Sequence, residues 1–108
     1  MATSYKVLGQ SFPSATTNTT LYTVPGATSA VASTLVVCNQ GATTTVRVAI
    51  RPAGAAITSS QYILYDVTVN ANDTLFLTIG LALATTDVVT VYTAAATVSF
   101  SLYGSEIA

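Results

Sequence analysis

The sequence contains 108 residues, which is the size of one domain, and we predict a single domain over residues 1–108. Only 6% of the residues are charged and the net charge is −1, whereas an ordinary globular domain carries about 25% charged residues. Three Lys and Arg residues are too few to line a groove for phosphates, so we expect no nucleic-acid partner. We find no secretion leader and no apolar run long enough for a membrane helix, so we expect no membrane partner.

This scarcity of charge leaves Thr, Ser, Asn, Gln and Ala to cover the surface. Because net charge helps to keep soluble monomers apart, a neutral surface favours a subunit that its neighbours cover. The alternative is a monomer that its many hydroxyl groups keep hydrated.

Apolar residues recur at every second position and turn-forming residues interrupt them regularly, which predicts strands throughout and no helix. We expect the first strand over residues 5–12, with Tyr5, Val7 and Gly9 on one face. Pro13 ends it because proline cannot donate to a strand ladder.

The second predicted strand is short, residues 21–24, and Pro25-Gly26 closes it with a type II turn in which Gly26 takes a positive φ. The third strand, residues 31–39, is apolar on both faces, which indicates a central position in a sheet. Simple alternation places Val31 and Leu35 on the same face of this strand.

The fourth predicted strand, residues 43–51, alternates cleanly. Val46 and Val48 point into the core, and Arg47 and Arg51 point outward. The two arginines could pair with acids on an adjoining strand or with acids of a neighbouring subunit, or they could belong to a solvated face.

The fifth predicted strand spans residues 62–69, with Tyr65 and Val67 on one face, and residues 70–73 form a turn. The sixth strand is bent or bulged at Gly80. Two more strands, residues 88–93 and 97–103, bring the total to about eight. We therefore predict an all-β antiparallel sandwich, with jelly-roll winding as one option and a closed barrel as the alternative.

Catalytic chemistry has few residues to use. The sequence has no His, which removes the commonest proton carrier and a frequent metal ligand. Asp73 and Asp87 could meet at one end of the sandwich as a glycosidase pair, but turn capping explains them more simply. Asn70, Asn72 and Asp73 could offer oxygens to calcium, although such sites usually hold more carboxylates. We predict no enzyme activity, no metal and no cofactor.

The single cysteine and the six tyrosines are the other notable side chains. Cys38 follows an apolar run and is expected to be a buried, structural thiol. Tyrosine supplies large contact area and a hydroxyl, which suits interfaces and sugar stacking. We expect about half of the tyrosines in the core, and Tyr62, Tyr92 or Tyr103 are candidates for exposed stacking.

Several stretches carry a resemblance: SYKVLGQ at the start, LYTVPGATSAVASTLVVCNQ, TVRVAIRPAG, YDVTVNANDT, DVVTVY and the final GSEI. In their order, and in a Thr-, Ala- and Val-rich but Lys-poor composition, the chain resembles short virion structural proteins of tailed bacteriophages, especially phages of cyanobacteria. The resemblance covers most of the chain and contains no catalytic motif. It implies an uncharged β module that coats or decorates a phage particle.

The expected function is therefore a non-enzymatic capsid decoration (cement) protein, located in the virion and assembled in the host cytoplasm. Its expected partners are further copies of itself, for example in a trimer, and other virion proteins such as the major capsid protein. The alternative is a tail, neck, baseplate or fibre module that recognises a host surface glycan. A small hydrolase ranks last.

The first strand and the polar segment up to Thr20 are the expected inter-subunit contacts, because irregular polar backbone needs hydrogen-bond partners. The candidate interface residues are Tyr5, Val7, Phe12, Arg47 and Arg51.

Overall fold

The computed structural model describes residues 2–108 and confirms the predicted all-β sandwich. Its eight strands are β1 (Thr3–Ser11), β2 (Thr19–Thr23), β3 (Ser29–Asn39), β4 (Thr44–Arg51), β5 (Tyr62–Val69), β6 (Thr74–Leu83), β7 (Val88–Thr93) and β8 (Val98–Ile107). Two short 3-10 turns, η1 (Pro52–Gly54) and η2 (Ser59–Gln61), interrupt the connection between β4 and β5. Within the described residues, no helix is long and apolar enough to cross a membrane.

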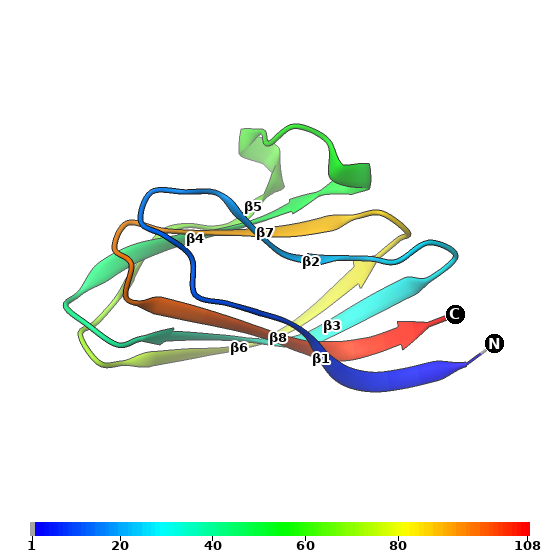
Figure 1. Ribbon diagram of the computed structural model, residues 1–108, viewed down its shortest axis with the longest axis horizontal. Coiled ribbons are helices and arrows are strands. Elements are labelled where there is room, and N and C mark those ends of the chain that lie inside the picture. The colour runs from blue at the N-terminus through cyan, green and yellow to red at the C-terminus, as the bar shows by residue number, and fades with distance from the viewer. Residues whose placement is uncertain (1) are drawn as a thin grey trace.

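The strands form two four-stranded antiparallel sheets, sheet A in the order β1-β8-β3-β6 and sheet B in the order β2-β7-β4-β5. Figure 1 shows sheet A below sheet B, with both ends of the chain at the same end of the sandwich. The chain changes sheet at every connection except the one between β4 and β5. The jelly-roll winding considered above stays a prediction.

The core lies between the two sheets and is built from side chains of medium size. Phe100, Leu35 and Leu102 are the largest fully buried side chains. The predicted inward positions Val46 and Val48 of β4 are also fully buried. Since apolar burial is the main favourable term in folding, these alternating inward positions account for the packing of one sheet on the other.

Bulges overturn the predicted faces of two strands in sheet A. The register of β1 shifts between Val7 and Gly9, so Val7 is exposed whereas Gly9 faces the backbone of Leu21 in sheet B. In β3 the register shifts between Ala32 and Thr34. Val31 is therefore exposed and Leu35 buried, although strict alternation placed them together.

A third bulge lies in β5. Val46 and Val48 of β4 are two residues apart, whereas their partners in β5, Val67 and Leu64, are three residues apart. Asp66, inside this bulge, has a φ of 52°. The extra residue leaves Tyr65 exposed and Val67 half-buried against the core, so the prediction that they share a face is wrong. The bulge predicted at Gly80 of β6 is confirmed by a register shift against β3.

Two local predictions need correction. The left-handed residue after β2 is Ala27, with a φ of 54°, and not Gly26, so the turn is not the predicted type II turn over Pro25-Gly26. Cys38 is half-buried and not buried, because it lies at an outward position of β3 opposite Ser99 and Thr74.

One buried amide joins three turns at the end of the sandwich opposite the termini. Asn39 is 1% exposed, and its Nδ2 donates to the carbonyls of Ala42, Val69 and Asn70. Its Oδ1 accepts from the backbone N–H of Gly41 and from the Thr97 hydroxyl. A buried amide with its polar atoms satisfied fixes the relative positions of the three turns.

Candidate interaction surfaces

The strands of sheet A hold two of the seven charged residues, Lys6 and Glu106. Lys6 and Glu106 pair with each other beside Tyr22 of sheet B. Three other charged residues belong to β4 and β5 of sheet B, and the last two lie in turns. These five are Arg47, Arg51, Asp66, Asp73 and Asp87. The strands of sheet A are thus poor in charge, and their two charged side chains pair with each other.

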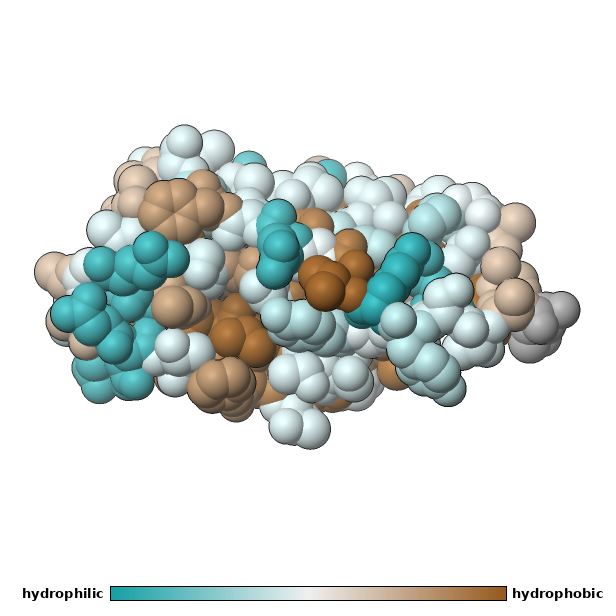
Figure 2. Space-filling model, turned by 60° about the horizontal axis from the view of Figure 1, so that its bottom comes forward, coloured by the Kyte–Doolittle hydropathy of each residue, from teal (hydrophilic) through white to brown (hydrophobic). Residues whose placement is uncertain are grey.

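Large apolar and aromatic side chains are exposed on this face. Tyr5 is 84% exposed, Phe76 is 74% exposed, and Val7 and Val31 are also exposed. They come from β1, β3 and β6, so they span the width of the sheet. Figure 2 brings the lower layer forward and shows brown and pale side chains over much of it, with hydrophilic side chains gathered at the left end and others near the middle.

A shallow hollow of about 470 Å³ opens on the same face, beside the protruding ring of Tyr5. Its walls come from β1, β3 and β8, and they combine apolar and hydroxyl-bearing residues with Lys6 of β1. The lining side chains include Tyr5, Val7, Val31, Ser33, Tyr103 and Ser105. The protruding Tyr5 ring and the hollow therefore lie side by side. β1 is an edge strand of sheet A, and the outer edge of its backbone is unpaired.

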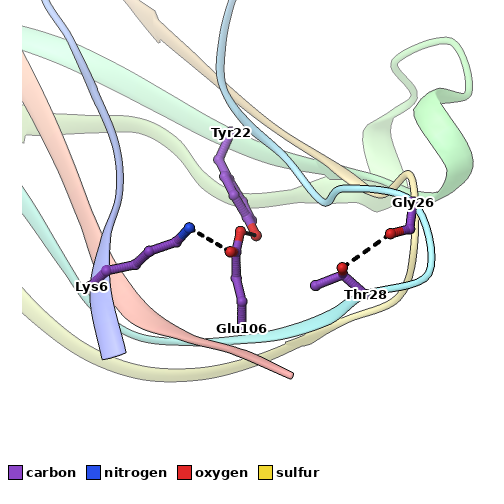
Figure 3. A network of polar contacts seen from close by, with 5 residues as sticks. All are labelled: Lys6, Tyr22, Gly26, Thr28 and Glu106. Carbon is purple, nitrogen blue, oxygen red and sulfur yellow. Dashed lines mark hydrogen bonds and ion pairs between the residues drawn. The ribbon is translucent and has the colours of Figure 1, made fainter. Parts of the chain in front are cut away.

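A polar network joins the two sheets near the chain ends (Figure 3). Lys6 Nζ lies 2.5 Å from Glu106 Oε1, and the Tyr22 hydroxyl donates to Glu106 Oε2 at 2.5 Å. The hydrogen bonds from Lys6 and then Tyr22 lower the pKa of Glu106 below its ordinary 4.5. Burial and the contact with Glu106 raise the pKa of Tyr22 well above its ordinary value. The network ties β1 and β8 to β2.

This network predicts a pH dependence of stability. Because the pKa of Glu106 is lowered in the fold, its stabilising contribution is present above about pH 4.5 and is lost as the pH falls through the folded-state pKa. We expect Glu106→Gln to lower the free energy of unfolding at neutral pH, and its difference from wild type to shrink below pH 4.5. Urea titrations at a series of pH values measure this difference. A difference that is equal at pH 7 and pH 3 would contradict the assignment.

A second cluster lies on the outer face of sheet B, and we call it the tyrosine–arginine cluster: Arg47, Tyr62, Tyr65, Asp66 and Tyr92. The Arg47 guanidinium carbon lies 4.4 Å from the ring centre of Tyr65 and 4.6 Å from that of Tyr92. Arg47 also donates from Nε and Nη2 to the two carboxylate oxygens of Asp66, at 2.7 and 3.3 Å. The hydrogen bonds to Asp66 raise the pKa of Arg47.

The predicted interface residues fall into two groups. Tyr5, Val7 and Phe12 are exposed on or next to β1, so they are free to contact a partner. Arg47 pairs with an acid on the adjoining strand, which was the first of its predicted alternatives. Arg51 instead donates to the carbonyls of Gly54 and Ala55, and so holds the loop that follows its own strand.

The other candidate sites are not assembled in the fold. Asp73 and Asp87 lie at opposite ends of β6, so the carboxylate pair at one end is wrong. Asp87 accepts from the backbone N–H groups of Ala53 and Ala84, which is turn capping. Residues 2–108 contain no cluster of three potential metal-ligating His, Cys, Asp or Glu side chains.

Only Tyr22 of the six tyrosines is buried, so the expectation that half of them are core is wrong. Tyr62, Tyr92 and Tyr103 are half-buried, and the most exposed rings are Tyr5 and Tyr65. The bulge of β5 explains the exposure of Tyr65, because it turns this ring away from the core.

Comparisons with models of known protein families, with curated proteins and with solved structures found no match.

Proposed function

We propose that the protein is a non-enzymatic structural subunit of a bacteriophage virion, a capsid decoration protein that assembles with further copies of itself on the shell. The observation that carries the proposal is the row of large apolar and aromatic side chains on the outer face of sheet A, where Tyr5, Val7, Val31 and Phe76 are exposed. A monomer seldom leaves an apolar patch open across a whole sheet, and such patches are typical of interaction sites.

A second copy of the chain is the occupant that fits this face best. The same surface offers a protruding ring, Tyr5, and the hollow beside it, so it can complement itself across a two-fold or a ring-forming contact. A net charge of −1 gives copies little reason to repel each other. Many identical weak contacts would then hold the shell together through avidity.

The experiment replaces the two most exposed rings by charges, in the double variant Tyr5→Asp and Phe76→Asp. Because interface aromatics often contribute about 2 kcal/mol or more each, we expect the dissociation constant between copies to rise by at least about 30-fold. Analytical ultracentrifugation measures the mass of the assembly, and quantitative gels of phage particles measure occupancy. Hundreds of copies per particle would support a place on the head.

The matched control is Ser60→Asp, which places a charge on the exposed connection above sheet B. It should leave mass and occupancy unchanged. An unaltered assembly in the double variant would refute the proposed face, and a strictly monomeric wild type that binds no particle would refute the proposed function.

A further inference from the structure

The tyrosine–arginine cluster on sheet B is not used by the proposed assembly face, which lies on sheet A. We propose that this cluster is a binding site for a neutral saccharide. The proposal goes beyond the proposed function, since a subunit can be held on its particle through one sheet while the opposite sheet faces outward.

The first argument is the state of the Tyr65 ring. It is 58% exposed, although Arg47 covers one part of it and Tyr62 meets it edge-on at 4.9 Å between ring centres. An aromatic ring held from two sides and still open to solvent is a rigid platform for the C–H face of a sugar. Side chains that are already fixed lose little entropy when a ligand binds.

The second argument is the set of polar groups beside the platform. A guanidinium has five N–H donors, and Asp66 engages two of those on Arg47. The Asp66 side chain is 43% exposed, so its carboxylate retains free acceptor capacity. Neighbouring hydroxyl groups of a sugar ring act as both donors and acceptors, and an arginine–carboxylate pair offers both partners at once.

The third argument is the hollow next to the ring, which has a volume of about 460 Å³ and is lined by Ser59, Tyr62 and Tyr65. Small-ligand sites usually have volumes of about 300–1,000 Å³. The wall at Ser59 is ordered, because Gln61 closes a capping box with Thr58 in η2. The hollow therefore suits one or two sugar rings.

The charge balance selects the class of saccharide. Arg47 is neutralised by Asp66, and no other cation lies in the cluster, so an acidic sugar would find no free positive charge. The segment that borders the hollow, Thr58–Gln61, carries only hydroxyl and amide side chains, which can also form hydrogen bonds with the hydroxyl groups of a neutral sugar.

The test uses saturation-transfer NMR on the full chain with neutral oligosaccharides of glucose, galactose, mannose and N-acetylglucosamine at millimolar concentration. We expect at least one of them to bind, with Tyr65→Ala lowering the affinity at least about tenfold. Tyr62→Ala, a second variant, should weaken the same ligand, so the result does not depend on one substitution. Tyr5→Ala, on sheet A, is the matched control and should bind as wild type does.

No binding to any neutral probe, binding of acidic oligosaccharides alone, or binding that Tyr65→Ala and Tyr62→Ala leave intact would each overturn the saccharide site. These outcomes are separate from the assembly test, since mass and particle occupancy depend on sheet A. Tyr65→Ala should leave both of these unchanged, and a loss of occupancy in this variant would assign the cluster to a protein contact instead.

Discussion

Replacing Phe100 by Ala should lower the free energy of unfolding by about 3–5 kcal/mol. Phe100 is the largest fully buried side chain and lies on β8, the strand between β1 and β3 in sheet A. Removing the ring leaves a cavity between the two sheets, and the packed sheets cannot move together to fill it. The variant therefore loses the transfer free energy of the buried ring and also bears the energetic cost of the cavity. Urea denaturation followed by circular dichroism measures the change.

The matched control is Phe76→Ala, which deletes the same side chain from the outer face of sheet A. Phe76 is 74% exposed, so we expect its removal to change the free energy of unfolding by no more than about 0.5 kcal/mol. If the two variants lose equal stability, the assignment of inner and outer faces in sheet A is wrong. Unchanged stability of Phe76→Ala would show that this ring is not needed for folding.

Much of the fold could be predicted because the two-residue alternation of a half-buried strand is a local signal. The predicted bounds of β5 and β7 match the structure, and β8 shows the expected alternation, with Val98, Phe100 and Leu102 fully buried. β8 extends to Ile107 instead of stopping near Tyr103, because its last residues pair with both β1 and β3. That pairing is a long-range contact, which no local pattern reports.

The errors in assigning residues to strand faces share one physical cause, the β-bulge. One extra residue moves all the following side chains to the other face, so an alternation rule fails from that residue onward. This is why Gly9, Val31 and Tyr65 were assigned to the wrong faces. Asp66 offered a signal, since Asp is uncommon inside strands and tolerates the left-handed region.

The candidate surfaces could be predicted only in part from the sequence. The shortage of charge predicts a neutral exterior, but it does not say which sheet face exposes the large apolar side chains. Arg47 could be paired with Asp66 only once β4 and β5 were known to be neighbours. Neither Phe76 nor Tyr65 was predicted as a surface residue, because exposure of a ring depends on register.

Gly104→Ala is the second substitution with a large expected effect, about 3 kcal/mol in the free energy of unfolding. A Cβ atom at this position would collide with the carbonyl oxygen of Val31 and approach the Cα of Ala32. These are backbone atoms of the neighbouring strand β3, so no side chain can rotate away to relieve the overlap. Thermal and urea unfolding measure the loss.

Gly80→Ala is its matched control, because a Cβ there meets no atom within 4 Å. Alanine restricts the unfolded chain and causes no strain at this site in the folded protein. The free energy of unfolding should therefore stay the same or increase by up to about 1 kcal/mol. A Gly104→Ala protein as stable as Gly80→Ala would contradict the close approach of β8 to β3.

The site of this close approach also links folding to assembly. Gly104 lies opposite Ala32, where the bulge of β3 turns Val31 outward, and both Gly104 and Val31 line the hollow on sheet A. A Gly104→Ala chain that still folds must therefore separate β8 from β3 and widen that hollow. We expect it to self-associate more weakly than Gly80→Ala at equal folded fraction, because a displaced wall no longer complements the ring of a second copy. Sedimentation of both variants at a temperature where each is fully folded separates this loss from the loss of stability, and equal assembly of the two would place the contact elsewhere on the face.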